Sequence, residues 1–399
     1  MALRLGRHVE GLVDSWTGDP AVPARVDAEP MMSPTQLAAD AARLADDVRR
    51  GSERGELSAA RAGVLLGRIG ALEALARRLA GVPVSYAEEV LASFGVRPGF
   101  GDLAAYSLAH RELDGLLPGR GALGARLHAW RASVTCPPQR VAEVVAALAA
   151  ELRTLSAGRW PLPTGEQVEW ATVGRAPWAG SAHHLGAGRT RVAVSAGLPV
   201  RLSHLPALVA HEAYPGHHTA ACRHDELLVR GRGELEHQVS VVLTPDALVG
   251  EGAAEHALAA ACPGGWAGMA EAVYAGLGLG FDGALAERVT GVLAGLGPVR
   301  QDAALLLHGA DGEPGSRRAA VEHLQVWGLM SPERARLSLE FLAHPLWRSY
   351  ITTYVEGGRL VGGWLAARPV AMGATERYAR LLDEALHPAD LARELAAGR

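Results

Sequence analysis

Three histidines and a glutamate stand close together in one stretch, His211-Glu-Ala-Tyr-Pro-Gly-His-His218. The stretch follows an apolar run, residues 205–210, that is typical of the first turns of a buried helix. Burying imidazole and carboxylate groups costs free energy unless a partner compensates them. A divalent metal ion is the usual partner, and His-Glu-x-x-His on a helix is its zinc-hydrolase form. There both histidines bind the ion and the glutamate activates a water molecule, so we predict that Glu212 is the catalytic base. The alternative is a polar helix end whose histidines are hydrogen-bonded within the protein.

The spacing departs from that pattern because position 215, four residues after His211, is a proline. The second ligand must therefore be His217 or His218. In a regular helix the sixth residue lies on the wrong face, and the seventh lies about 10.5 Å further along the axis. A break at Pro215-Gly216 can bring the next histidine back toward His211. We favour His217 as the ligand. His218 would then support a ligand or face the substrate; the alternative is that His218 is the ligand and His217 is not.

A third ligand is expected because two imidazoles rarely complete a catalytic zinc site, in which one further position is left to water. The segment Glu251-Gly-Ala-Ala-Glu-His256 lies in a predicted helix, and Glu251 and Glu255 are one turn apart in it. A glutamate from a following helix commonly supplies the third ligand in such hydrolases. We therefore predict Glu251 as a ligand and Glu255 as the group that orients a histidine. A solvated acidic face is the alternative, although alanine and leucine surround these carboxylates.

Residues near the C-terminus offer donors for a developing oxyanion. Tyr350 and Tyr354 are one helical turn apart, and a tyrosine hydroxyl stays protonated at neutral pH. We name Tyr354 as the catalytic donor and Tyr350 as a substrate contact. Arg348 and Arg359 could bind a substrate carboxylate, and His184, in a glycine-rich segment before the motif, could also contact substrate. A tyrosine that only fills the core is an equally good interpretation of the pattern.

The chain of 399 residues can bury a large core, as one domain or as two intimately packed regions, which we place at residues 1–158 and 159–399. Alanine and leucine dominate, which favours helices. The net charge of −4 and the absence of a basic stripe give no case for nucleic acid. No apolar run is long enough to cross a bilayer, and the N-terminus lacks a signal-peptide core.

The cysteines Cys136, Cys222 and Cys262 are odd in number and show no C-x-x-C spacing. A disulfide framework is therefore not expected, which favours a reducing cytoplasm. The sequence leaves the oligomeric state open.

Helical patterns fill most of the chain. In the first region they cover residues 33–50, 56–79, 86–94, 102–116, 123–133 and 139–155; after the motif they cover residues 246–261, 264–279, 282–308, 313–327, 332–342 and 347–366. Residues 167–173 and 190–195 alternate like strands, with a hairpin or open loop at 178–188 between them. The edge of such a sheet could hold an extended peptide beside the metal, or the hairpin could simply cap the bundle.

The octet at 211–218 resembles the His-Glu-Ala-x-Pro-Gly-His-His hallmark of a bacterial family of zincin-like proteins of unknown function. That family is grouped with helical metallopeptidases such as thermostable carboxypeptidases, oligopeptidases and angiotensin-converting-enzyme-like proteins. Glu251-Gly252 matches the start of a second family motif, whose later positions differ here, and Tyr354-Val-Glu-Gly357 looks like a late Tyr-x-x-Gly. The resemblance implies a mainly α, helical zincin-like fold with a small β-sheet beside the metal-binding helix.

These observations lead us to expect one Zn²⁺ ion and hydrolysis of a peptide or small amide substrate, without a nucleic-acid or membrane partner. One alternative is a non-haem iron enzyme, since two histidines and a carboxylate also form that site. Another is a member of the fold that is inactive or acts on one dedicated amide in a biosynthetic pathway. The sequence does not distinguish terminal from internal cleavage.

Overall fold

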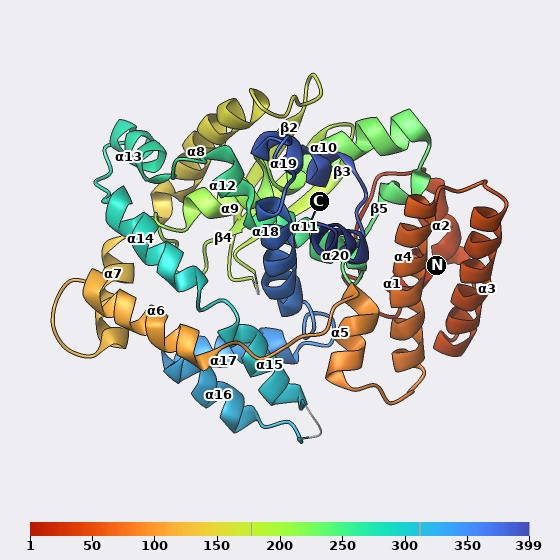
Figure 1. Cartoon of the computed structure of the whole chain (residues 1–399), viewed down its shortest axis with the longest axis horizontal. Helices are drawn as coiled ribbons and strands as arrows, with labels where there is room; N and C mark the ends of the chain where they lie inside the picture. The colour runs from red at the N-terminus through yellow and green to blue at the C-terminus, as the bar shows by residue number, and fades with distance from the viewer. Residues whose placement is uncertain (177, 311–312, 399) are drawn as a thin grey trace.

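Helices form most of the protein, and two small β-sheets accompany them (Figure 1). The computed structural model describes residues 1–176, 178–310 and 313–398. Up to residue 157 the elements are α1 (Ala2–Gly6), β1 (Val13–Trp16), α2 (Ala21–Ala28), α3 (Pro34–Glu53), α4 (Ala59–Leu79), α5 (Tyr86–Phe94), α6 (Leu103–Leu116), α7 (Leu123–Ser133), the short η1 (Pro138–Arg140) and α8 (Val141–Ala157). The prediction of a mainly α fold with a small sheet is confirmed.

The second half begins with the larger sheet and continues with helices. Its elements are β2 (Gln167–Val173), β3 (Gly180–Gly186), β4 (Arg189–Ser195), α9 (Leu205–Glu212), α10 (His217–His224), η2 (Asp225–Arg230), η3 (Leu235–Gln238), β5 (Val239–Val241), α11 (Pro245–Glu255), α12 (Ala257–Ala261), α13 (Ala267–Gly276), α14 (Gly283–Ala294), α15 (Val299–His308), α16 (Arg317–Val326), α17 (Pro332–Ala343), η4 (Thr353–Gly357), α18 (Gly358–Ala366), α19 (Ala374–Asp383) and α20 (Pro388–Ala396). Of the irregular turns, η2 and η4 are π-helical.

Local signals account for the ends of several helices. Ser33 and Gln36 form a reciprocal capping box at the start of α3, with a proline in the first helical position. Ser85 and Glu88 do the same for α5, which ends at Gly95 in the left-handed conformation. These two helix starts therefore follow directly from the sequence.

Three predicted helices are divided in the structure. The predicted helix 282–308 is wrong as one element, because Gly295, Gly297 and Pro298 separate α14 from α15. The predicted helix 246–261 breaks at His256, between α11 and α12. The stretch 347–366 becomes a π-helical turn followed by α18. Strands β1 and β5 were not predicted.

The larger sheet has the order β2-β4-β3, so β3 forms one edge. Strand β2 runs parallel to β4, and β3 runs antiparallel to it. The glycine-rich segment thus forms a strand, and not an open loop. The short strands β1 and β5 pair in a second sheet, and β1 packs against β3.

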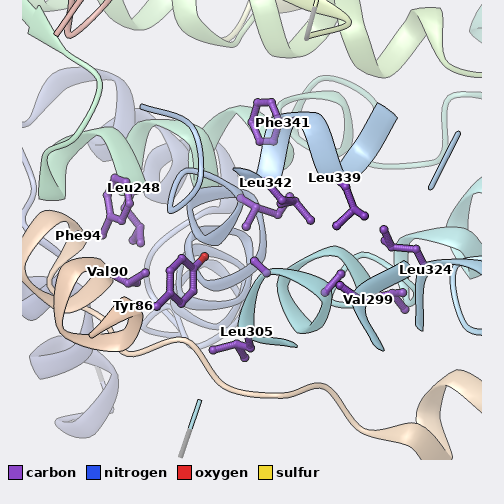
Figure 2. Close-up of a cluster of buried hydrophobic side chains, with 14 of the residues drawn as sticks. Tyr86, Val90, Phe94, Leu248, Val299, Leu305, Leu324, Leu339, Phe341 and Leu342 are labelled. Atoms are coloured by element: carbon purple, nitrogen blue, oxygen red, sulfur yellow. The ribbon is translucent and has the colours of Figure 1, made fainter. Parts of the chain in front are cut away.

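Helix α11 is held between two hydrophobic cores. Its Leu248 lies in a core built with residues of α5, α15, α16 and α17, shown in Figure 2. The next residue, Val249, lies in a core that includes residues of α8, α9, α13 and α18–α20. Each buried leucine or valine contributes about 1.5–3 kcal/mol. Both cores draw on residues from before and after residue 158, and the division into two regions stays a prediction.

Among the described residues, no helix combines the length and apolar character that crossing a bilayer requires.

Candidate metal centre

Three side chains from α9, α10 and α11 bring ligand atoms together. The Nε2 atoms of His211 and His217 are 3.2 Å apart. Oε2 of Glu251 lies 3.3 Å from Nε2 of His211, and its Oε1 lies 3.3 Å from Nε2 of His217. One atom of each residue lies within 4.8 Å of the other two. The structure thus groups the three residues that the sequence named as ligands.

The break between α9 and α10 produces this arrangement. Helix α9 ends at Glu212, and α10 begins at His217. The amide of Gly216 donates to the carbonyl of Ala210 over 2.9 Å, and a Cβ at position 216 would lie 1.8 Å from the carbonyl oxygen of His211. Only glycine, which has no Cβ, allows the backbone to approach this carbonyl so closely. The close approach turns the chain back toward α9, and the rings of His211 and His217 pack edge to face.

Two glycines bring α11 and η4 into contact. A Cβ at Gly252 would lie 2.4 Å from the carbonyl oxygen of Gly357, and a Cβ at Gly357 would lie 2.5 Å from that of Leu248. This close approach places the hydroxyl of Tyr350 2.8 Å from Oε1 of Glu251, to which it donates. Tyr350 was expected to contact substrate; it lines the cavity, and that contact stays a prediction.

The carboxylate and the two imidazoles shift one another's pKa values. Burial alone would raise the pKa of Glu251, but the adjacent His217 and His211 hold it far below its usual range. Burial would lower the pKa of His211, yet Glu251, Glu212 and Glu255 raise it to about 9. No described residue donates a hydrogen bond to the enclosed Oε2 of Glu251. A buried carboxylate oxygen without a donor, beside two imidazole nitrogens, fits a divalent cation.

Glu212 lies beside the three ligands and is buried, with 5% of its surface exposed. Its carboxylate packs against β3, because a Cβ at Gly180 would lie 2.7 Å from Oε1. Burial raises the pKa of Glu212, although His211 and His217 oppose the shift. A carboxylate with a raised pKa is better able to accept a proton near neutral pH.

The ring of Tyr354 lies near that of His211, with the two ring centroids 6.3 Å apart. Burial raises the pKa of Tyr354 well above its usual value. Its hydroxyl therefore remains a donor over the whole physiological range. Glu255 lies near the opposite nitrogen of the His211 ring, with its Oε1 3.5 Å from Nδ1. This is the placement expected of a group that orients the imidazole.

His218 does not join the three ligands. Its ring is fully buried, with Nε2 2.7 Å from Oε2 of Glu166 and Nδ1 2.8 Å from Oγ1 of Thr190. Tyr214 also donates to Glu166, over 2.9 Å. This network of hydrogen bonds connects α10 to the larger sheet. It explains why His218 is not part of the ligand group. No pattern in the sequence pointed to Glu166, which stands alone before β2.

Two predicted substrate ligands lie elsewhere. Arg348 pairs with Glu89 of α5, and Arg359, with 80% of its side chain exposed, pairs with Glu356. Neither lines the cavity at the three ligands, and the binding of a substrate carboxylate by one of them stays a prediction. His184 does line that cavity, with its Nε2 2.8 Å from Oδ2 of Asp225.

The cavity has a volume of about 500 Å³. Its lining includes the three ligands, Glu212, both tyrosines, and the edge-strand residues Gly180, Ser181 and Ala182. Asp14 of β1 also lines it; burial raises the pKa of this carboxyl, while His183 and His217 lower it. No sequence pattern pointed to Asp14, because it lies far from the motif on a strand that was not predicted.

No protein-family model and no curated protein matches the chain. The fold is similar to the crystal structure of a protein from Colwellia psychrerythraea with a provisional description as a lipoprotein. The TM-score is 0.52 at 14% identity, and the match covers 78% of this chain. The chain spans about half of that protein, since 54% of it is covered. At this identity the similarity concerns the fold alone.

Proposed function

We propose that the chain is a zinc-dependent hydrolase of peptide or related amide bonds. The convergence of His211, His217 and Glu251 at one face of a cavity carries the proposal. Two imidazoles and one carboxylate are the donor set of many catalytic zinc sites, in which one position is left to water. Tyr350 donates a hydrogen bond to Glu251, and Glu255 lies near Nδ1 of His211. Contacts of this kind hold metal ligands in the orientation that the ion requires.

When bound there, the ion supplies Lewis acidity for the amide carbonyl and lowers the pKa of water. Glu212 then accepts a proton from the attacking water and returns it to the leaving nitrogen. Its position against Gly180 keeps the carboxylate beside the ligands. Tyr354 donates a hydrogen bond to the oxygen that develops negative charge.

Strand β3 gives the substrate a place to lie. It forms the edge of its sheet, and its residues 180–182 line the cavity beside Glu212. An extended backbone can hydrogen-bond to such an edge, which aligns an amide with the catalytic groups. This favours peptides over compact amides. The three unpaired cysteines agree with our proposal of a cytoplasmic location.

The test is digestion of a peptide library by zinc-loaded protein. We expect cleavage by the wild type and a loss of at least about 10³-fold in kcat for Glu212→Gln, with metal content unchanged. Full activity in Glu212→Gln would exclude the proposed base. If the purified protein contains iron and consumes oxygen, the iron-enzyme alternative replaces this proposal.

A further inference from the structure

One carboxylate in the cavity of the metal centre has neither a partner nor a role in the proposed reaction. The acidic residues that line the cavity are Asp14, Glu212, Asp225, Asp246, Glu251 and Glu384. Within the described part of the chain, no hydrogen bond and no ion pair reaches the side chain of Asp14. This carboxylate is therefore available to a ligand in the cavity.

The other carboxylates of the cavity are accounted for. His184 lies 2.8 Å from Asp225, and Arg68 donates to Asp246 over 2.7 Å. Glu384 is likewise paired with an arginine of its own helix, α19, or the residue that follows it. Glu251 and Glu212 are the proposed ligand and the proposed base. Asp14 remains, and its charge needs an explanation because an unpaired buried charge is costly.

Asp14 lies at a β-bulge. Val13 pairs with Val241 and Ser15 pairs with Ser240, so Asp14 is an extra residue of β1 between two paired ones. A bulge leaves its extra residue outside the regular pairing and changes the direction of its side chain, and bulges are frequent next to active sites. The backbone thus accounts for a carboxylate that lines the cavity.

Strand β1 packs against β3, the strand on which we expect the substrate to lie. A Cβ at Gly186 would lie 3.2 Å from Cβ of Thr17, so the last residues of the two strands meet. Asp14 and His183 each precede this contact by three residues, and the charge of His183 acts on the Asp14 carboxyl. Asp14 therefore faces the part of β3 whose residues 180–182 line the cavity.

The described lining of the cavity offers Asp14 no free cation. Arg68 is the arginine among these residues, and it is committed to Asp246. The ligand group consists of His211, His217 and Glu251 and does not include Asp14. A substrate that carries a positive charge would supply the missing partner.

We propose that Asp14 binds a protonated amino group of the substrate, either the α-amino terminus of a peptide or a lysine side chain. This inference rests on the proposed hydrolase function and names its substrate class. A volume of about 500 Å³ is typical of small-molecule sites, which span about 300–1,000 Å³. A short peptide along β3 fits this space, with its amino group at Asp14 and an amide at the metal centre. An ammonium group donates charge-assisted hydrogen bonds to a carboxylate.

The first experiment measures amine binding without turnover. The melting temperature of the metal-loaded wild type is recorded with increasing n-butylammonium chloride, and with sodium chloride at the same ionic strength. We expect a saturable increase that is specific to the amine, because a ligand of the folded state stabilises it. Asp14→Asn, which keeps the shape and removes the charge, should lose the increase. Asp27→Asn, on the exposed surface of α2, is the control and should respond like the wild type.

The second experiment compares three versions of one tripeptide: trialanine with a free amino terminus, the same peptide acetylated, and an acetylated peptide with lysine in the first position. We expect the wild type to show a kcat/KM at least about tenfold higher for one of the charged peptides than for the neutral one. In Asp14→Asn this preference should disappear. The charged peptide that the wild type prefers identifies the source of the amino group.

Zinc affinity separates this role from support of the metal. Asp14→Asn should bind zinc as tightly as the wild type in competition with a chromophoric chelator, because Asp14 is outside the ligand group. A loss of zinc binding of tenfold or more in Asp14→Asn would refute the proposal, since Asp14 would then serve the ion and not the substrate.

The two proposals fail separately. Equal cleavage of the three peptides, in the wild type and Asp14→Asn alike, would refute the amino-group site and leave the hydrolase intact. Absence of a saturable melting increase with the amine would also refute the site. If no peptide is cleaved but the amine still stabilises the wild type and not Asp14→Asn, the amino-group site stands and the hydrolase proposal fails.

Discussion

The hydroxyl of Tyr350 donates a 2.8 Å hydrogen bond to Oε1 of Glu251. This contact joins the turn before η4 to α11, and Gly357 of η4 itself approaches Gly252 of α11 closely. It fixes one carboxylate oxygen and leaves the other, Oε2, without a donor among the described residues. The two tyrosines one turn apart therefore have different roles. Both line the cavity; we propose that Tyr350 positions Glu251 and that Tyr354 acts on the substrate.

We expect Tyr350→Phe to weaken zinc binding about 10- to 100-fold, because an unsupported ligand carboxylate loses its orientation. Competition with a chromophoric chelator measures the dissociation constant. Tyr354→Phe is the matched control, since it should keep wild-type affinity and lose roughly 10²- to 10³-fold in kcat. Equal zinc affinity in both variants would contradict the separate roles.

Replacing Gly252 by alanine should separate α11 from η4. The new Cβ would lie 2.4 Å from the carbonyl oxygen of Gly357, so we expect a loss of about 1–3 kcal/mol in unfolding free energy and weaker zinc binding. Gly250→Ala on the same helix is the control, because nothing lies within 4 Å of its Cβ position. That change should be neutral or stabilise by up to about 1 kcal/mol. Denaturant unfolding measures the unfolding free energy of both variants. Similar losses in the two variants would exclude a specific contact between Gly252 and Gly357.

Gly180→Ala should affect catalysis more than stability. The added methyl group would lie 2.7 Å from Oε1 of Glu212 and 2.9 Å from Cδ1 of Leu208. Displacing the carboxylate by a fraction of an ångström to one ångström can cost about 10²-fold in kcat, while the zinc content should stay at the wild-type level. Gly174→Ala, where the same methyl group has open space, should leave kcat unchanged. A wild-type kcat in Gly180→Ala would show that catalysis does not depend on the position of the Glu212 carboxylate against Gly180.

The Glu166–His218 contact predicts acid sensitivity. Burial would raise the pKa of Glu166, but hydrogen bonds with His218, Arg153 and Tyr214 outweigh it and lower the pKa from 4.5 to about 2. A depressed carboxyl pKa stabilises the fold fully above pH 4.5, and the contribution is lost as the pH falls toward 2. For this enclosed side chain the shift corresponds to about 3 kcal/mol.

Unfolding free energies of wild type and Glu166→Gln from pH 7 to pH 2 test this contribution. The difference between the two proteins should be largest at pH 7 and shrink below pH 4.5. Glu169→Gln, in the following strand β2 and with 38% of its side chain exposed, should differ little from the wild type at any pH. A difference for Glu166→Gln that does not change with pH would refute the electrostatic explanation.

Local patterns predicted much of the fold and part of the site. The capped starts of α3 and α5 and the two alternating strands follow from neighbouring residues. Residue types and the helix break at Pro215-Gly216 favoured His217 over His218 as the partner of His211, and they named Glu251 as the candidate third ligand. Neighbouring residues carry this information for the helix starts, the strands and the two histidines, whereas Glu251 was expected because a following helix commonly supplies the third ligand.

Contacts between distant segments were not predictable in this way. Glu166 meets His218 only because β2 pairs with β4 and α10 packs behind the sheet. Arg348 looked available for a substrate, yet it pairs with Glu89, 259 residues away in the chain. Only the tertiary structure decides which charges are paired.

The most direct test is elemental analysis of protein purified without added metal. The wild type, His217→Ala, His218→Ala and Glu251→Ala are compared for zinc per chain. We predict about one zinc ion in the wild type, loss in His217→Ala and Glu251→Ala, and retention in folded His218→Ala. Zinc that is lost in His218→Ala but kept in His217→Ala, or absent from all four proteins, would contradict the ligand set on which the proposed function rests.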